Sequence, residues 1–347
     1  MNFATLFDIN YLSRGLCLID SLTRVLKQNY QLFILALDEE TANYFYNQNN
    51  PQLVVISLPE IEKKYPDLLI AKNNRNKVEY YFTLSPVLPF YILETFPDCA
   101  RITTLDADVY FFSDPSVILT HFQKDDILIT PHDFSSNLLF LENYGRYNVS
   151  FQSFPNTADA KILLQDWMKK CLTWCKDVLD PVTGYFADQK YLDRWKIDFK
   201  NVCDVDLKTA GRAPWNINET PLNLKQGKLL VNGQPLIYYH FHHLRIYDHF
   251  IAHGINLYGP AKVNREVRKL YRTYILNLKK NSKLIKTVSD NQVIRYNSPT
   301  QPSSLLSTMW QRELGAIYIL QTVIFFNLTY IKRVYRYLLK KKNGLFS

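Results

Sequence analysis

The sequence is poor in cysteine and glycine, and it begins without a recognisable secretion signal. Its five cysteines are odd in number and their spacings match no zinc site and no redox motif, so we expect reduced thiols. The first ten residues, MNFATLFDIN, contain neither a basic region nor an apolar core, so we expect no signal peptide and a cytoplasmic protein. Gly15 is the only glycine close to the first apolar run, which argues against a Gly-rich phosphate loop there.

Composition places the chain among folded proteins with a basic end. Hydrophobic residues make up 47% of the 347 residues, which is enough for a packed core and too much for a disordered chain. Residues 261–347 carry 17 lysines and arginines and three acidic residues, whereas the preceding part carries 24 basic and 29 acidic residues. Such a segment favours contact with an anionic surface. We expect this basic segment to contact a membrane surface, and we expect no nucleic-acid partner.

The basic segment also contains an apolar stretch. Residues 286–304 have the composition of a linker, and GAIYILQTVIFFNLTYI follows at 315–331. A membrane-spanning helix needs roughly 20 apolar residues, and Gln321 and Asn327 interrupt this shorter run. Six lysines and arginines follow between residues 332 and 342, which favours a helix lying on the anionic cytoplasmic face of a membrane. The alternative is a helix packed on the body of the protein or on another subunit.

Strand and helix patterns alternate along residues 1–260. Apolar runs typical of buried strands are FATLFDI, QLFILAL, PQLVVISLP, RITTLDADVYFF, DDILITPH and RYNVSFQSF. Helical spacing occurs in GLCLIDSLTRVLKQ, SPVLPFYILETF and DAKILLQDWMKKCLTWCKDVL, and FADQKYLDRW opens a further helix. Asn232-Gly233 predicts a hairpin turn. This order predicts an α/β domain with a largely parallel sheet, in which ligands bind at the carboxyl ends of strands.

Two carboxylates, Asp106 and Asp108, end the apolar run that begins ITTL. In a strand, residues two apart share a face, so both acids would point to one ligand while Ala107 points away. Burying a carboxylate without a partner is costly, and a cation is the natural partner. Hard oxygen ligands suit Mg²⁺ or Mn²⁺, which also take substrate phosphates. The alternative is a solvated strand end without a ligand.

The segment LDADVYFFSDP resembles the Asp-x-Asp motif of glycosyltransferases with the GT-A fold. Four later segments, YNVSFQSF, FADQKYL, GRAPWNI and YYHFHHLR, resemble donor-site segments of the same enzymes in the same order. The resemblance covers roughly residues 3–250. In the order and spacing of these segments the chain is similar to the sugar-nucleotide-dependent transferases of glycosyltransferase family 8. It implies a GT-A domain, with a Rossmann-like mixed sheet, over residues 1–260, followed by a basic helical extension over residues 261–347.

The resemblance implies a metal site that holds Mn²⁺ or Mg²⁺. Asp108 would bind the ion directly, and Asp106 would contact the ribose of the donor as well as the metal. The third protein ligand would be His240 or His242. The pattern His240-x-x-His243 overlays the His-x-x-Gly of the family, which favours His240, although a histidine stands here where glycine is usual.

The resemblance also implies donor-binding and catalytic positions. Asp188 and Gln189 would be the catalytic pair, with Asp188 on a sugar hydroxyl and Gln189 beneath the anomeric carbon. For Asp188 the alternative is a helix N-cap, which aspartate also favours. The other implied donor contacts are Asp8, Tyr11, Lys77, Tyr80, Asn148, Trp215 and Arg245.

These assignments predict an enzyme of hexosyltransferase type. It would move a glycosyl group from a nucleotide-activated sugar, most naturally a UDP-sugar, to a glycan or lipid-linked acceptor in polysaccharide biosynthesis, with retention of configuration. Charge grows on the departing phosphate while the sugar becomes oxocarbenium-like, so a cation at the phosphate is needed. The alternatives are a sugar-nucleotide nucleotidyltransferase, and a non-catalytic membrane-associated protein on the same fold.

Overall fold

The computed structural model describes residues 1–246, 251–252, 254–258 and 263–288. The chain divides after His240 into two units, Met1–His240 and Phe241–Ser347. The boundary predicted near residue 260 stays a prediction. The predicted linker at 286–304 begins with three residues that are helical, at 286–288, and the rest of it and the apolar run at 315–331 lie outside the described residues.

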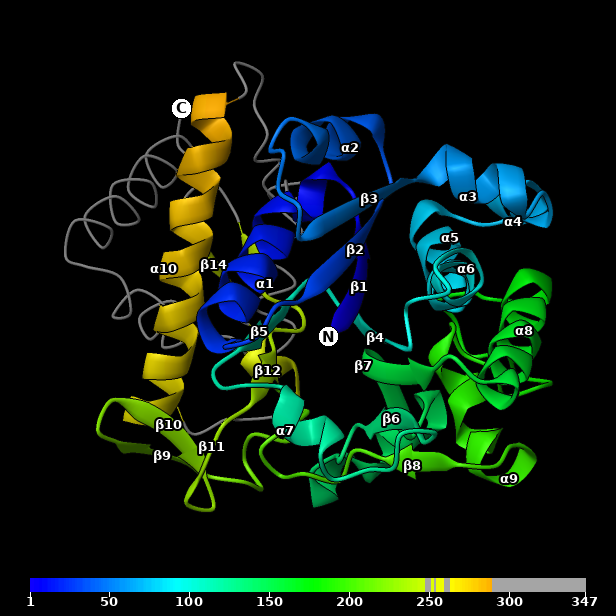
Figure 1. Cartoon of the computed structure of the whole chain (residues 1–347). Coiled ribbons are helices and arrows are strands. Elements are labelled where there is room, and N and C mark those ends of the chain that lie inside the picture. The colour runs from blue at the N-terminus through cyan, green and yellow to red at the C-terminus, as the bar shows by residue number, and fades with distance from the viewer. Residues whose placement is uncertain (247–250, 253, 259–262, 289–347) are drawn as a thin grey trace, which may run out of the picture. The chain divides into compact units, whose positions relative to one another are not determined.

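The first unit is built on a seven-stranded mixed sheet in the order β3-β2-β1-β4-β7-β6-β8 (Figure 1). Its strands are β1 (Asn2–Phe7), β2 (Gln31–Ala36), β3 (Leu53–Ser57), β4 (Arg101–Leu105), β6 (Ile127–Pro131), β7 (Tyr147–Pro155) and β8 (Val202–Asp204). The first four are parallel, and β7 runs antiparallel between β4 and β6. The predicted α/β sheet is confirmed, and β1 and β4 bring their carboxyl ends to one edge.

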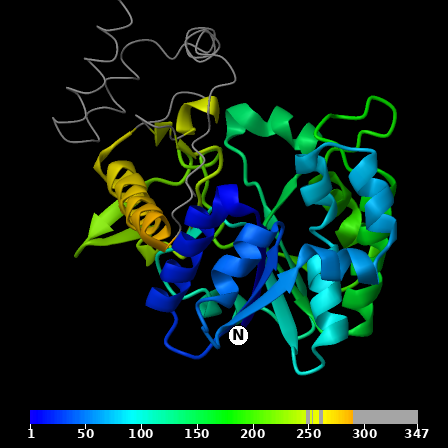
Figure 2. The same ribbon diagram turned by 90° about the horizontal axis from the view of Figure 1, so that it is seen from above.

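Helices cover both faces of this sheet. They are η1 (Ile9–Tyr11), α1 (Leu12–Val25), α2 (Glu39–Tyr46), α3 (Leu58–Lys64), α4 (Asp67–Asn73), α5 (Lys77–Thr83), α6 (Val87–Thr95), α7 (Ser116–Leu119), η2 (Ser136–Tyr144), α8 (Ala158–Thr173), η3 (Gln189–Arg194) and α9 (Trp195–Asp198). Seen from above, the dark blue α1 and α2 lie on one side of the strands, and the cyan and green α5, α6 and α8 lie on the other (Figure 2). Parallel strands need crossover connections, which are right-handed in nearly all proteins, and such connections place helices over the faces of the sheet.

Two small sheets complete the first unit. Strand β5 (Val109–Phe111) pairs antiparallel with β12 (Tyr238–His240). Strands β9 (Leu222–Lys225), β10 (Lys228–Val231) and β11 (Gln234–Pro235) form the other sheet. The hairpin turn predicted at Asn232-Gly233 is confirmed, with φ of 50° and 79°, values that suit these two residue types.

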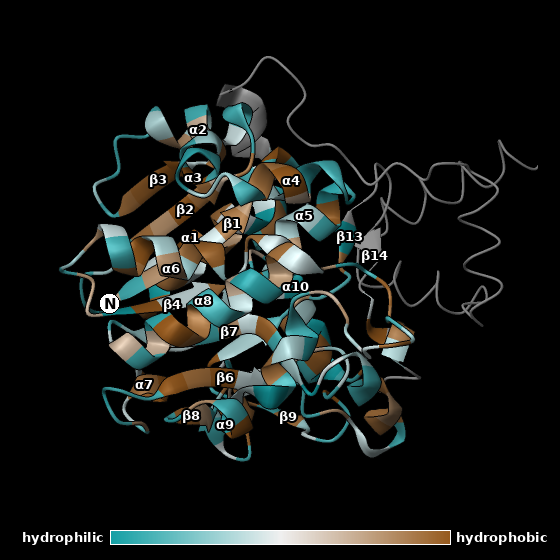
Figure 3. Cartoon of the chain, turned by 90° about the vertical axis from the view of Figure 1, so that its right-hand side faces the viewer, coloured by the Kyte–Doolittle hydropathy of each residue, from teal (hydrophilic) through white to brown (hydrophobic). Residues whose placement is uncertain are grey.

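The core lies between the sheet and its helices. Hydrophobic colouring is concentrated on the strands, as on β2, β3 and β6 in Figure 3, because a sheet covered on both faces buries both sets of side chains. Gly15 lets α1 approach the sheet closely, since a Cβ atom there would lie 2.3 Å from the ring of Phe7. All five cysteines are free thiols, and four of them are buried.

Within the residues that the structure describes, the second unit contains a short hairpin and one long helix. Its elements are β13 (Arg245–Ile246), β14 (Ile251–Ala252), η4 (Ile255–Tyr258) and α10 (Arg265–Val288). Phe241 stacks on Tyr274 of α10, with ring centroids 3.9 Å apart. Within the described parts of the chain, every helix is either too short or too polar to cross a membrane.

Candidate metal and donor site

The acids Asp106 and Asp108 lie in a turn, and this corrects the predicted continuous strand. Strand β4 ends at Leu105, and the amide of Val109 donates to the carbonyl of Asp106 over 3.1 Å, which closes the turn. The amide of Asp106 donates to the carbonyl of Ser150 on β7, also over 3.1 Å. The turn is therefore fixed at both ends. It brings the two acids together by chain reversal and not by the alternation of side chains along a strand.

His240 joins the acids because β12 pairs with β5. In this ladder His240 lies opposite Val109, the residue after Asp108. Its Nε2 atom lies 3.0 Å from Oδ1 of Asp108 and 3.6 Å from Oδ2 of Asp106. One ligand atom from each of the three residues falls within 4.8 Å of the others.

The charges of this group favour a cation. Burial, with the negative charge of Asp108 adding to it, raises the pKa of Asp106 to about 6 against the opposing effect of His240. Burial lowers the pKa of His240, but the two carboxylates outweigh this and raise it. A positive charge among the three side chains would relieve the cost of keeping both acids ionised.

The geometry fits a divalent ion. Octahedral ligands about 2.1 Å from an ion stand about 3 Å from each neighbour, which the distances from His240 to the two acids approach. Two carboxylates and one imidazole form a donor set that suits Mn²⁺, and Mg²⁺ less well because Mg²⁺ prefers oxygen. Side-chain exposure of 36% at Asp106 and 13% at Asp108 leaves room for further ligands.

A second cluster lies at the carboxyl end of β1. Asp8 is buried and accepts hydrogen bonds from the backbone and side-chain amides of Asn10 and from the hydroxyl of Tyr81. Lys77 places its ammonium group 2.8 Å from the Asp8 carboxylate and keeps 62% of its side chain exposed. Burial opposes ionisation, but the bonds from Lys77 and Asn10 hold the pKa of Asp8 below its usual value.

Tyr81, and not Tyr80, accompanies Lys77 in this cluster. Lys77 and Tyr81 are four residues apart on α5 and share one face of the helix. Tyr80 is buried in the hydrophobic core and donates its hydroxyl to Glu62 over 2.7 Å. Tyr11, at the end of η1, is 44% exposed, with the guanidinium of Arg14 over its ring.

Asp188 is a buried acid on a strained loop. The preceding Ala187 has φ of 47°, a left-handed conformation that costs free energy outside glycine. The loop is held by the amide of Ala187, which donates to the carbonyl of Lys176, and by the indole of Trp167, which donates to the carbonyl of Asp188. Burial, aided by the charge of Asp106, raises the pKa of Asp188 to about 7, and its Oδ2 atom accepts no hydrogen bond.

Gln189 follows at the start of η3, where the predicted helix is a 3-10 helix. Its Nε2 atom donates to the carbonyl of Tyr144 over 2.8 Å. Gly145, with φ of 133°, packs against this side chain, and a Cβ atom there would lie 3.3 Å from Cγ of Gln189. The end of η2 therefore holds the glutamine side chain in one orientation.

Asn148 supports the acid turn from β7. Its Oδ1 atom accepts from the amide of Ser150 over 3.1 Å and from the hydroxyl of the same residue over 2.5 Å. Its Nδ2 atom donates to the carbonyl of Pro131. The carbonyl of Ser150 accepts the hydrogen bond from the amide of Asp106, so Asn148 supports the Asp-x-Asp turn through Ser150. The sequence pattern did not indicate this role.

Trp215 lies against the candidate metal ligand His240, and His132 lies beside Trp215. Trp215 is 3% exposed, and its ring meets the imidazole of His240 edge-on. His132 is buried beside Trp215, and burial lowers its pKa to about 3, so the ring is neutral. His132 was missed at the sequence level, because a single histidine after a strand carries no motif of its own.

Two predicted residues belong to the second unit. His242 contacts the rings of His243 and Tyr258, and the group of three that could hold a metal contains His240 and not His242. Arg245 is exposed at the start of β13. Their predicted roles in metal and phosphate binding stay predictions.

Comparison with known proteins gives the family and the fold. The sequence matches no protein-family model. It is 28% identical over 282 residues to YfnD of Bacillus subtilis strain 168, an uncharacterized protein, covering 80% of this chain and 89% of YfnD. It is 31% identical over 252 residues to YfnF, an uncharacterized protein of the same strain, covering 70% of this chain and 82% of YfnF. The chain belongs to the YfnF family.

This YfnF-family chain has the GT-A glycosyltransferase fold. Its structure is similar to the crystal structure of the galactosyltransferase LgtC in complex with donor and acceptor sugar analogs, with a TM-score of 0.50 and 14% identity, covering 81% of this chain and 96% of LgtC. At such identity the likeness establishes the fold. The expectation of a GT-A domain is thus confirmed, and membership of glycosyltransferase family 8 stays a prediction.

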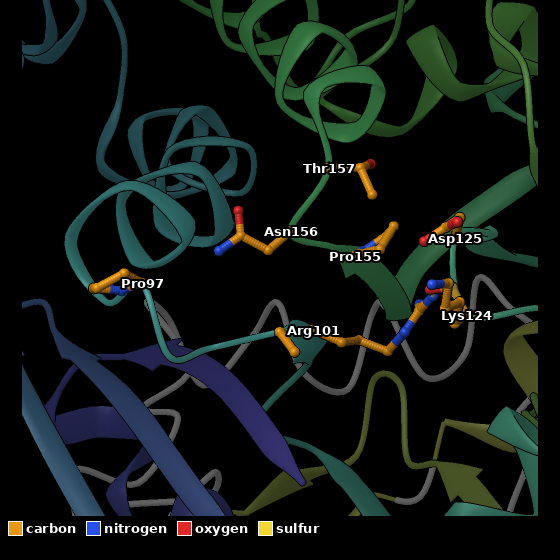
Figure 4. Close-up of a pocket in the computed structure, with 8 residues that line it drawn as sticks. Pro97, Arg101, Lys124, Asp125, Pro155, Asn156 and Thr157 are labelled. Atoms are coloured by element: carbon orange, nitrogen blue, oxygen red, sulfur yellow. Dashed lines mark hydrogen bonds between the residues drawn. The ribbon is translucent and has the colours of Figure 1, made fainter.

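A pocket in this YfnF-family chain lies at the opposite end of β4 from the acids. It has a volume of about 410 Å³ and is lined by Pro97, Ala100, Arg101, Lys124, Asp125, Pro155, Asn156 and Thr157 (Figure 4). The guanidinium of Arg101 donates to the carbonyls of Lys124 and Asp126. These two bonds engage the guanidinium of Arg101 within the protein, and the pocket contains none of the candidate site residues.

Proposed function

We propose that this protein is a metal-dependent glycosyltransferase that uses a nucleotide-activated sugar, most naturally a UDP-sugar. One observation carries the proposal. Asp106 and Asp108 share one turn and His240 comes from a strand far along the chain, yet one ligand atom from each lies within 4.8 Å of the others at the carboxyl edge of a GT-A sheet. In open α/β sheets this edge is where ligands bind.

The three side chains would hold Mn²⁺ or Mg²⁺, with Mn²⁺ favoured by the imidazole. When bound, the ion supplies Lewis-acid stabilisation of the charge that grows on the departing diphosphate. Asp108 and His240 are the more buried members and set the position of the site. Asp106, more exposed, has carboxylate surface available for the donor ribose as well.

The cluster at β1 would hold the nucleotide. Lys77 is an exposed ammonium group anchored at one side by Asp8, so it offers its remaining hydrogens to a phosphate or to the base. Tyr81 replaces Tyr80 in this proposal, because its hydroxyl lies at the same carboxylate. Tyr11 offers an exposed aromatic ring at the neighbouring turn, suited to stacking on a base.

The loop at Asp188 would bind the transferred sugar. Its Oδ2 atom accepts no hydrogen bond in the protein, so a sugar hydroxyl is a natural donor to it. The strain at Ala187 is consistent with a loop held for binding. Gln189, oriented by Tyr144, would lie beside the anomeric carbon, and no carboxylate base is assigned on the acceptor side, which suits retention of configuration.

The acceptor and the membrane contact rest on composition. We propose a glycan or lipid-linked sugar acceptor, reached at an anionic cytoplasmic membrane face through the basic segment 261–347. In its described part, six basic residues of α10 are exposed: Arg265, Arg268, Lys269, Arg272, Lys279 and Lys280. Vesicle flotation of the full chain against a chain ending at Thr300 tests this contact, and equal flotation of both would end it.

Thermal-shift screening of sugar nucleotides with and without Mn²⁺ tests the main proposal. We expect stabilisation by a UDP-sugar only when Mn²⁺ is present, and its loss in Asp108→Asn. Detection of free UDP on addition of candidate acceptors then establishes transfer. Release of pyrophosphate from a nucleoside triphosphate and a sugar phosphate would instead identify a nucleotidyltransferase. Absence of any metal-dependent shift would contradict the proposal and favour a binding protein.

A further inference from the structure

The segment Gly211–Asn216 contacts His240 at two points. The amide of His240 donates to the carbonyl of Arg212 over 2.8 Å, which fixes the backbone of the histidine. The ring of Trp215 meets the imidazole of His240 with centroids 5.5 Å apart and an interplanar angle of 89°. One short segment therefore restrains both the main chain and the ring of the candidate metal ligand.

Trp215 is itself held firmly. Its indole N–H donates to the carbonyl of His132 over 2.7 Å, and the side-chain amide of Asn216 donates to the same carbonyl over 2.9 Å. The ring of His132 lies edge-on to Trp215 at 5.0 Å and stacks on Phe134 at 4.5 Å. The indole has one polar atom, and that atom is already used inside the protein.

Arg212, at the other end of this segment from Trp215, is anchored by its own side-chain bonds. Its buried guanidinium lies 2.7 Å from the carboxylate of Asp133 and donates to the hydroxyl of Thr220 over 3.0 Å. Asp133 adopts φ of 51°, a left-handed conformation that the surrounding contacts maintain. The carbonyl that receives the amide of His240 is thus part of a rigid, charge-paired loop.

We propose that Trp215 is a positioning residue that holds the imidazole of His240 toward Asp106 and Asp108, and that it does not contact the donor. This inference rests on the proposed metal-dependent function. A metal ligand whose ring is free to rotate loses conformational entropy on binding, so packing that fixes the ring in advance strengthens the site. Groups that orient a metal ligand typically change metal affinity by about 10- to 100-fold when they are removed.

The test compares Trp215→Leu and Trp215→Phe with the control Trp195→Phe. Trp195 is also buried, at 1% exposure, but its indole nitrogen donates to no acceptor, so this change measures the general cost of altering a buried tryptophan. Isothermal titration with Mn²⁺ alone gives the affinity. We expect a loss of about tenfold in Trp215→Leu, a smaller loss in Trp215→Phe, and wild-type affinity in Trp195→Phe.

A second readout does not depend on metal. In protein labelled at histidine rings, the His240 signal is assigned by its absence in His240→Gln, and without metal it should shift or broaden in Trp215→Leu but not in Trp195→Phe. Wild-type Mn²⁺ affinity together with an unchanged His240 signal in Trp215→Leu overturns the inference. Absence of Mn²⁺ binding by the wild type overturns the proposed function. In that case the His240 ring signal by itself shows whether Trp215 orients the imidazole. Trp215→Phe keeps both readouts usable if Trp215→Leu does not fold.

Discussion

Nε2 of His240 lies 3.0 Å from Oδ1 of Asp108 because His240 and Val109 are direct partners in the β5–β12 ladder. His240 and Asp108 are far apart in the sequence. His240 is the last residue of the three-residue strand β12, and Asp108 immediately precedes the three-residue strand β5. A slip of one position would turn the imidazole to the other face of the ladder. The candidate metal site therefore depends on the register of one short strand pair.

Replacing Asp108 by Asn should weaken metal binding with little effect on folding. The substitution removes one charge and one good ligand, so the Mn²⁺-assisted affinity for UDP should fall at least about tenfold, measured by calorimetry. Asp114→Asn is the matched control. Asp114 lies in the same segment and accepts from the amide of Ser116, which asparagine also allows. Equal UDP affinity in wild type and Asp108→Asn would contradict the metal assignment.

Stability without metal should depend on pH through Asp188. Burial raises its folded pKa to about 7, above the usual value of 3.8, so the folded state keeps the proton longer than the unfolded state does. Its contribution to stability is thus full below about pH 4 and is lost as the pH rises to about 7.

Asp188→Asn lacks this titration. In urea unfolding with a chelator present, its stability relative to wild type should increase between about pH 4 and pH 7, by up to about 4 kcal/mol. A difference that stays constant over that range would show that the carboxyl group ionises as readily in the folded chain as in the unfolded one.

Tyr81→Phe should weaken nucleotide binding, whereas Tyr80→Phe should not. The hydroxyl of Tyr81 donates to Asp8 beside Lys77, whereas the buried Tyr80 donates its hydroxyl to the partly exposed Glu62. Calorimetry with UDP and Mn²⁺ should therefore show reduced affinity only for Tyr81→Phe. Tyr80→Phe should instead lower the free energy of unfolding by about 1 kcal/mol. The reverse pattern would restore Tyr80 as the donor contact.

Gly145→Ala should reduce turnover by displacing Gln189. A Cβ atom at this position would press on Cγ of Gln189 at 3.3 Å, and φ of 133° disfavours any side chain. Gly227→Ala is the control, since Gly227 also has positive φ, at 78°, but nothing lies within 4 Å of its Cβ position. We expect both to lose stability and only Gly145→Ala to lose kcat. Equal kcat in the two variants would remove Gln189 from the reaction.

Several elements and the acid pair followed from local patterns. The apolar runs at β1 and β2 and the Asn232-Gly233 turn appear where the sequence placed them, because alternation, apolar content and turn residues act over a few neighbours. Asp106 and Asp108 were found as a pair because their spacing is unusual after an apolar run. Their turn was mistaken for strand, since a three-residue reversal leaves no periodicity to read.

Contacts between distant segments did not follow from such patterns. The choice between Tyr80 and Tyr81 depends on how α5 is rotated against the sheet, and one residue changes the direction of a helical side chain by about 100°. The contact of Trp215 with His240 depends on a hydrogen bond to His132. Neither has a signature in the local sequence.

Local residue order was thus enough to establish an α/β chain with acids at a strand end and a strongly basic terminus. The family resemblance already favoured His240 as their partner, but only the tertiary structure brought His240 to the acids, Tyr81 to Asp8, and Trp215 to the ring of the histidine. The reason is that propensity and periodicity arise from neighbours along the chain. Strand register and side-chain packing arise instead from the free energy of contacts between segments that meet only in the folded state.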